Sequence, residues 1–132
     1  MAENGVVSIQ SSVSASTTVD RLLAALAARQ LTVFARVDHA AGAATVGLNL
    51  RPTELVIFGN PQGGTGLMQD RQTAGIDLPL KALVWEAADG TAWLAYNDPA
   101  WIAQRHGLGA ASGAATKAIA AMLASVAQEA TK

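Results

Sequence analysis

The sequence predicts an α+β fold in which a twisted antiparallel sheet of about five strands carries helices on one face. Three observations support this prediction. Several segments alternate apolar and polar residues with the period of two that is typical of half-buried strands. Two other segments repeat apolar residues at helical spacing. Consecutive strands are joined by links too short for parallel crossovers, which favours antiparallel pairing in the order β-α-β-β-β-β-α.

The first strand is indicated by Val7, Ile9 and Val13, which alternate with polar residues. Thr17 and Asp20 form a pair that can cap the helix expected from about Thr18 to Arg29. Alternating or continuous apolar runs then predict the other strands, at Leu31 to His39, Glu54 to Phe58, Leu80 to Glu86 and Thr91 to Tyr96.

The surest pairing is the hairpin around Asp89-Gly90, because an Asp-Gly pair between strand-like runs is a strong turn signal. Residues 40–47 are expected to be a short helix or a loop, and residues 62–66 a loop that leads to a helical turn over 67–72. A helix starting near Pro99 is expected to end at Gly107. The last helix is expected from about Gly113 to Glu129, with an apolar stripe on its buried face.

Length and composition limit the classes of function that the chain can have. The 132 residues, 51% hydrophobic and 14% charged, predict one folded domain over residues 1–132. A net charge of −1 with no basic block argues against nucleic acid as a partner. No cysteine is present and the two histidines are far apart in sequence, so neither a metal site nor a cofactor is expected.

The chain shows no secretory signal pattern, and its last helix carries several polar residues. We therefore expect no membrane segment and a cytoplasmic location.

Nine short motifs along the chain together resemble the domain-of-unknown-function family 302. They are Asp38-His39-Ala40, Arg51-Pro52-Thr53, Phe58-Gly59-Asn60-Pro61, Gly64-Thr65, Leu67-Met68, Asp77-Leu78-Pro79-Leu80-Lys81, Trp85-Glu86, Tyr96-Asn97-Asp98-Pro99 and His106-Gly107-Leu108. The similarity covers about Val19 to Leu108. It implies a fold similar to one repeat of the TATA-binding protein, found as homodimers, in a family with no settled activity. DNA binding is not implied, because the composition lacks the cations for a basic face.

Six polar residues near strand ends and turns are candidates for a site: Asp38, His39, Arg51, Asn60, Lys81 and Asn97. His39 is the candidate catalytic group, because a nearby carboxylate can orient an imidazole for acid–base chemistry. Asp38 and His39 are adjacent, however, and neighbouring strand residues point to opposite faces. Each candidate also has a structural interpretation, such as an ion pair of Arg51 or a turn stabilised by Asn60. His106 is expected to bond a free carbonyl at a helix end.

Three functions are compatible with these residues. The first is a homodimeric module that binds a small anionic or carbonyl-bearing ligand at the strand ends. The second is an acid–base enzyme that uses His39, and the third is a purely structural or protein-interaction domain. A homodimer is expected because the strands at Glu54 to Phe58 and Leu80 to Glu86 are apolar on both faces.

Overall fold

The computed structural model describes residues 3–132 and contains a five-stranded sheet in the order β1-β5-β4-β3-β2. Every neighbouring pair is antiparallel. The strands are β1 (Val6–Gln10), β2 (Thr32–Asp38), β3 (Thr53–Gly59), β4 (Leu80–Glu86) and β5 (Ala92–Asn97). The predicted fold class and the hairpin between β4 and β5 are confirmed. Gly90 has a φ of 87° in that hairpin, which explains why glycine stands there.

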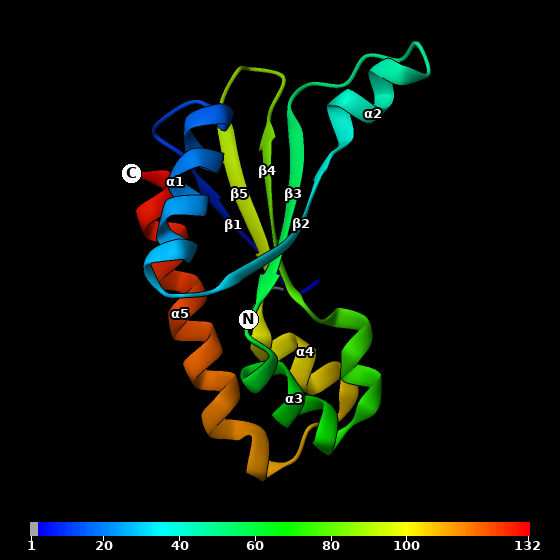
Figure 1. Cartoon of the computed structure of the whole chain (residues 1–132), viewed down its shortest axis with the longest axis vertical. Helices are drawn as coiled ribbons and strands as arrows, with labels where there is room; N and C mark the ends of the chain where they lie inside the picture. The colour runs from blue at the N-terminus through cyan, green and yellow to red at the C-terminus, as the bar shows by residue number, and fades with distance from the viewer. Residues whose placement is uncertain (1–2) are drawn as a thin grey trace.

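Two long helices, α1 (Ala15–Ala28) and α5 (Gly113–Thr131), lie side by side on one face of the sheet (Figure 1). This arrangement confirms the predicted packing. The first helix starts earlier than predicted, because the Ser14 hydroxyl accepts a hydrogen bond from the Thr17 amide at 3.1 Å. The other helical segments are α2 (His39–Thr45), α3 (Pro61–Asp70), η1 (Gln72–Asp77), α4 (Pro99–His106) and η2 (Ala110–Ser112).

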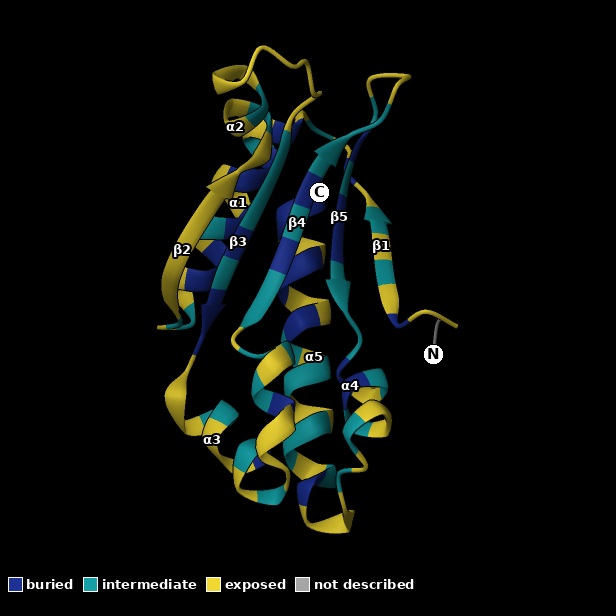
Figure 2. Cartoon of the chain, turned by 90° about the vertical axis from the view of Figure 1, so that its right-hand side faces the viewer, coloured by how far each residue is buried: buried dark blue, intermediate teal, exposed yellow. Residues whose placement is uncertain are grey.

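The core lies between the sheet and the two long helices (Figure 2). Alternate residues of the three central strands point into it and meet the apolar stripes of α1 and α5. The largest fully buried core side chains are Phe58, Leu22, Leu26, Leu94, Val56, Val84 and Val126. Residues 110–131 are long and apolar enough to cross a membrane by length and composition. Leu123, Val126 and Ala130 of this stretch are core residues.

The loop predicted over residues 62–66 is wrong, because these residues belong to α3. The side chain of Asn60 accepts a hydrogen bond from the Gln62 amide at 2.9 Å, and Pro61 occupies the first helical position. These two start signals outweigh the poor helix propensity of the three glycines that follow. Residues 40–47, left open as a helix or a loop, contain most of α2, which begins at His39.

Within residues 3–132, no helix covers the face of the sheet opposite α1 and α5. Leu55 pairs with Leu83 across this face, and Trp85 pairs with Trp93. The two indole rings are stacked with their centroids 6.0 Å apart. The α2 helix and the loop after it extend away from α1 and α5 (Figure 1). Leu55, Leu83, Trp85 and Trp93 are partly exposed on the helix-free face in the single chain.

Candidate functional site: an apolar pocket beside α3

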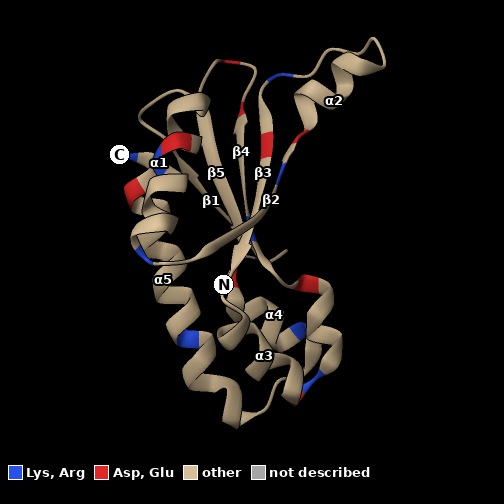
Figure 3. Ribbon diagram, in the orientation of Figure 1, with Lys and Arg blue, Asp and Glu red and all other residues tan. Residues whose placement is uncertain are grey.

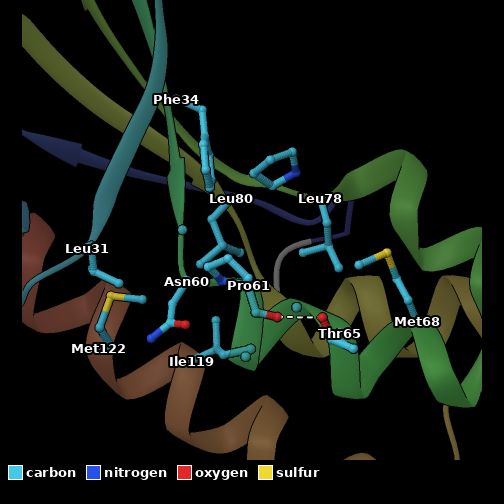
Figure 4. A pocket seen from close by; sticks show the side chains of 14 residues that line it. Leu31, Phe34, Asn60, Pro61, Thr65, Met68, Leu78, Leu80, Ile119 and Met122 are labelled. Atoms are coloured by element: carbon cyan, nitrogen blue, oxygen red, sulfur yellow. Dashed lines mark hydrogen bonds between the residues drawn. The ribbon is translucent and has the colours of Figure 1, made fainter.

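An apolar pocket of about 430 Å³ lies where the end of β3 passes into α3 (Figure 4). It is bounded by the edge strand β2, by the segment that leads into β4, and by the middle of α5. The lining residues are Leu31, Phe34, Gly59, Asn60, Pro61, Gly63, Gly64, Thr65, Met68, Leu78, Pro79, Leu80, Ile119 and Met122. None of them carries a charge.

A β-bulge places Phe34 at this pocket. The register between β2 and β3 shifts between Val33 and Ala35, so Phe34 is an extra residue on the edge strand. Its ring lies beside Gly59, where an added Cβ would come within 3.6 Å of it. Phe34 is 49% exposed, which is unusual for a phenylalanine, and it forms part of the rim.

Glycine keeps the α3 side of the pocket open. A Cβ at Gly64 would lie 3.8 Å from a methyl group of Leu78 and 3.9 Å from the terminal methyl of Met68, and all three residues line the pocket. A side chain at position 64 would thus extend among the lining residues. At Gly66, two residues further along the same helix and outside the lining, an added Cβ would meet nothing within 4 Å.

Asn60 supplies the polar side chain at the start of α3. Its Oδ1 accepts from the Gln62 amide at 2.9 Å, and its main-chain oxygen accepts from the amides of Gly63 and Gly64. Within residues 3–132 its Nδ2 group has no hydrogen-bond partner, although an amide nitrogen can donate twice. The Thr65 hydroxyl donates to the Pro61 carbonyl at 2.6 Å, so its proton is used locally.

The six predicted site residues do not come together. Asn60 lines the apolar pocket, Asp38 lines a second cavity beside α1, and Arg51 lines a third cavity next to α2. The Asp38 carboxylate caps α2 by accepting from the Ala41 amide at 2.9 Å. His39 is exposed on the first turn of α2, and the Arg51 Nε donates to the Glu86 carbonyl at 3.0 Å.

Lys81 and Asn97 lie on the helix-free face of the sheet, opposite Ile57 and Val6 respectively. The Lys81 ammonium donates to the Pro79 carbonyl at 2.9 Å, and partial burial lowers the pKa of Lys81. Neither residue lines any of the three cavities. A single site built from all six candidates is therefore not what the fold provides. Charged residues are scattered over the molecule rather than gathered in one patch (Figure 3).

Sequence reasoning missed a cluster of side chains that joins η1 to α4. Asp77 accepts from His106 Nε2 at 2.6 Å and from Arg105 Nη1 at 3.0 Å. Since a carboxylate only accepts, Nε2 donates in this pair, and Nδ1 is hydrogen-bonded to the Thr73 hydroxyl at 3.1 Å. The expectation that His106 bonds a main-chain carbonyl is wrong, because both of its ring nitrogens are hydrogen-bonded to side chains of η1. These hydrogen bonds link η1 to α4, and none of the four side chains lines the three cavities described above.

A sequence model of the family described as "Domain of unknown function DUF302" matches residues 7–127. The chain belongs to this family. The similar structure titled "Crystal structure of uncharacterized conserved protein DUF302 from Bacillus stearothermophilus" superposes with a TM-score of 0.85. The match covers 97% of this chain and 98% of the other at 19% identity, so it shows that the two DUF302 chains share a fold.

Three curated Brucella proteins are 53% identical to this DUF302 chain over 117 residues, or 89% of its length. The Brucella suis protein is named "Fluoride-specific ion channel FluC 1", as is that of Brucella abortus. The Brucella melitensis protein is named "Fluoride-specific ion channel FluC 2". The match spans 46% of the first protein and 43% of the other two, which is less than half of each.

Proposed function

We propose that this DUF302 domain is a homodimeric module that binds a small, mainly apolar molecule in the pocket beside α3. The pocket carries the proposal, because its volume of about 430 Å³ and its lining of apolar groups with two polar side chains, Asn60 and Thr65, are typical of small-molecule sites. Rigid elements hold its walls, since β3 is central in the sheet and α5 packs on the core.

The use of glycine in α3 supports a binding role over a purely structural one. Glycine inside a helix costs up to about 1 kcal/mol relative to alanine. A side chain at Gly64 would find room beside Leu78 and Met68, and would add helix propensity as well as contacts. With glycine at position 64, the helix lacks this propensity and these contacts, and the pocket keeps the space that a side chain would fill.

Two matched variants test the binding proposal. In Gly64→Leu the new side chain enters the pocket, whereas in Gly66→Leu the same side chain is added to the same helix away from the pocket. The probe is the neutral fluorescent amine N-phenyl-1-naphthylamine, titrated into each protein. Saturable binding to the wild type and to Gly66→Leu, reduced at least tenfold in Gly64→Leu, is expected. Absence of saturable binding, or equal loss in both variants, would refute the proposal.

The helix-free sheet face supports the homodimer. Leu55, Leu83, Trp85 and Trp93 are partly exposed there in the single chain. Several large apolar side chains that are partly exposed on one face are typical of an interface. A second copy offers the same surface, so a two-fold arrangement would cover both faces at once.

Light scattering tests the dimer. The wild type is expected to give twice the chain mass of 13.5 kDa, and Leu83→Glu is expected to give the single-chain mass. Ala24→Glu is the control, because Ala24 is exposed on α1, on the opposite side of the sheet. Far-UV circular dichroism must show that both variants are folded. A wild type that scatters as a single chain at micromolar concentration would contradict the dimer.

Acid–base catalysis by His39 has less support, because the side chain is exposed and lines none of the three cavities. Ion conduction, the activity in the names of the Brucella relatives, is not proposed for this chain. The names of the Brucella relatives describe proteins of which the match covers less than half.

A further inference from the structure

We infer that the pocket beside α3 accepts an uncharged aliphatic compound that bears a carbonyl group, such as an acyl amide or ester, with its carbonyl oxygen at Asn60 Nδ2. This inference rests on the proposed binding function and names the chemical class of its ligand.

The lining favours an aliphatic chain. Leucine, isoleucine, methionine and proline side chains make up most of the walls, and Phe34 at the rim is the aromatic residue among them. Met68 and Met122 lie on two sides of the pocket, in α3 and α5 (Figure 4). Methionine is flexible and polarisable, so its side chain can adapt to a chain of methylene groups.

The absence of ionisable side chains among the lining residues disfavours a charged group inside the pocket. Moving a carboxylate or an ammonium group out of water without a partner of opposite charge is costly. Lys81, on the neighbouring strand β4, already donates to the carbonyls of Asp77 and Pro79. Of the two ligand types expected from the sequence, anionic or carbonyl-bearing, the pocket therefore fits the second.

Hydrogen bonding at the start of α3 defines the polar contact. The amides of Gln62, Gly63 and Gly64 are all used by Asn60, through its side chain or its main-chain oxygen. The capping role fixes Oδ1 toward Gln62, so the amide group can offer only its Nδ2 protons to a ligand. A donor of this kind pairs with a carbonyl oxygen.

Competition with N-phenyl-1-naphthylamine tests the ligand class. Decanamide is expected to displace the probe at least tenfold more effectively than decanoate at pH 7.5, because only the carboxylate must be desolvated as an ion. Octanamide should bind about fifteenfold more weakly than decanamide, since each buried methylene contributes about fourfold, the equivalent of ~0.8 kcal/mol.

Asn60→Ser isolates the polar contact, because serine caps a helix about as well as asparagine, but its short side chain has no group at the position of Nδ2 when its hydroxyl oxygen caps the Gln62 amide. We expect decanamide to bind this variant about fivefold more weakly, within the range for one neutral hydrogen bond. N-phenyl-1-naphthylamine has no carbonyl group, so its affinity for Asn60→Ser should equal its affinity for the wild type. Equal binding of decanoate and decanamide, or no effect of Asn60→Ser on decanamide, would overturn the inference while leaving the binding function intact. A probe that does not bind the wild type would instead refute the binding function itself.

Discussion

Removing the imidazole of His106 should destabilise the protein by about 2–3 kcal/mol. The side chain is 6% exposed and that of Asp77 is 12% exposed, so water screens their 2.6 Å hydrogen bond very little. A hydrogen bond to a charged group contributes about 1.5–3 kcal/mol, and His106→Ala also removes the hydrogen bond between Nδ1 and the Thr73 hydroxyl. Arg105 still binds the Asp77 carboxylate after the change, which limits the loss.

Urea denaturation followed by circular dichroism measures this cost, with Arg105→Ala as the comparison. The Arg105 side chain is 47% exposed, so its ion pair with Asp77 should contribute less than about 1 kcal/mol. Asp77→Asn combined with His106→Ala completes a double-mutant cycle, in which we expect a coupling energy of about 1–2 kcal/mol. If His106→Ala lowers the free energy of unfolding by less than about 0.5 kcal/mol, or by less than Arg105→Ala does, the reasoning is refuted.

Three further predictions concern stability. Thr18→Val should lower the free energy of unfolding, measured by urea denaturation, by about 1–3 kcal/mol, because the buried Ser11 hydroxyl loses its acceptor 2.6 Å away. Thr18→Ser keeps an oxygen there and should lower the free energy of unfolding by less. Hydrogen bonds from the Ser112 hydroxyl and the Gly109 amide lower the pKa of Asp70 below its ordinary 3.8. Their stabilisation is therefore complete above about pH 4 and is lost as the pH falls through the lower pKa of the folded state, so Asp70→Asn should flatten that part of an acid titration. An unchanged titration would count against this assignment. Gly66→Ala should raise the free energy of unfolding by up to about 1 kcal/mol, since α3 gains propensity without a clash, and a lower midpoint in urea would show that reasoning to be mistaken.

Most of the sheet could be predicted because its signals are local. The Asp89-Gly90 turn defines the hairpin of β4 and β5, and the alternation of apolar residues defines the strand faces. Glycine-rich α3 was harder, because propensity favours a loop over residues 62–66 and only the cap at Asn60 with Pro61 favours a helix.

The site was less accessible from sequence because it depends on contacts between distant segments. Asn60 was a candidate, but its apolar surroundings come from β2, α5 and the segment before β4. The β-bulge that brings Phe34 to the rim has no recognisable sequence signal here. The link between Asp77 and His106 joins residues 29 positions apart, and no motif marks it.

The most direct test of the pocket is methionine methyl NMR. Met68 and Met122 both line the pocket, from different helices, so one bound molecule should perturb both methyl signals. With the signals assigned through Met68→Leu and Met122→Leu, titration with decanamide is expected to shift both along saturable curves with a single dissociation constant. The shifts should be lost in Gly64→Leu and kept in Gly66→Leu. Signals that do not move, or that drift linearly with concentration in the wild type, would contradict the proposal that this pocket binds a ligand.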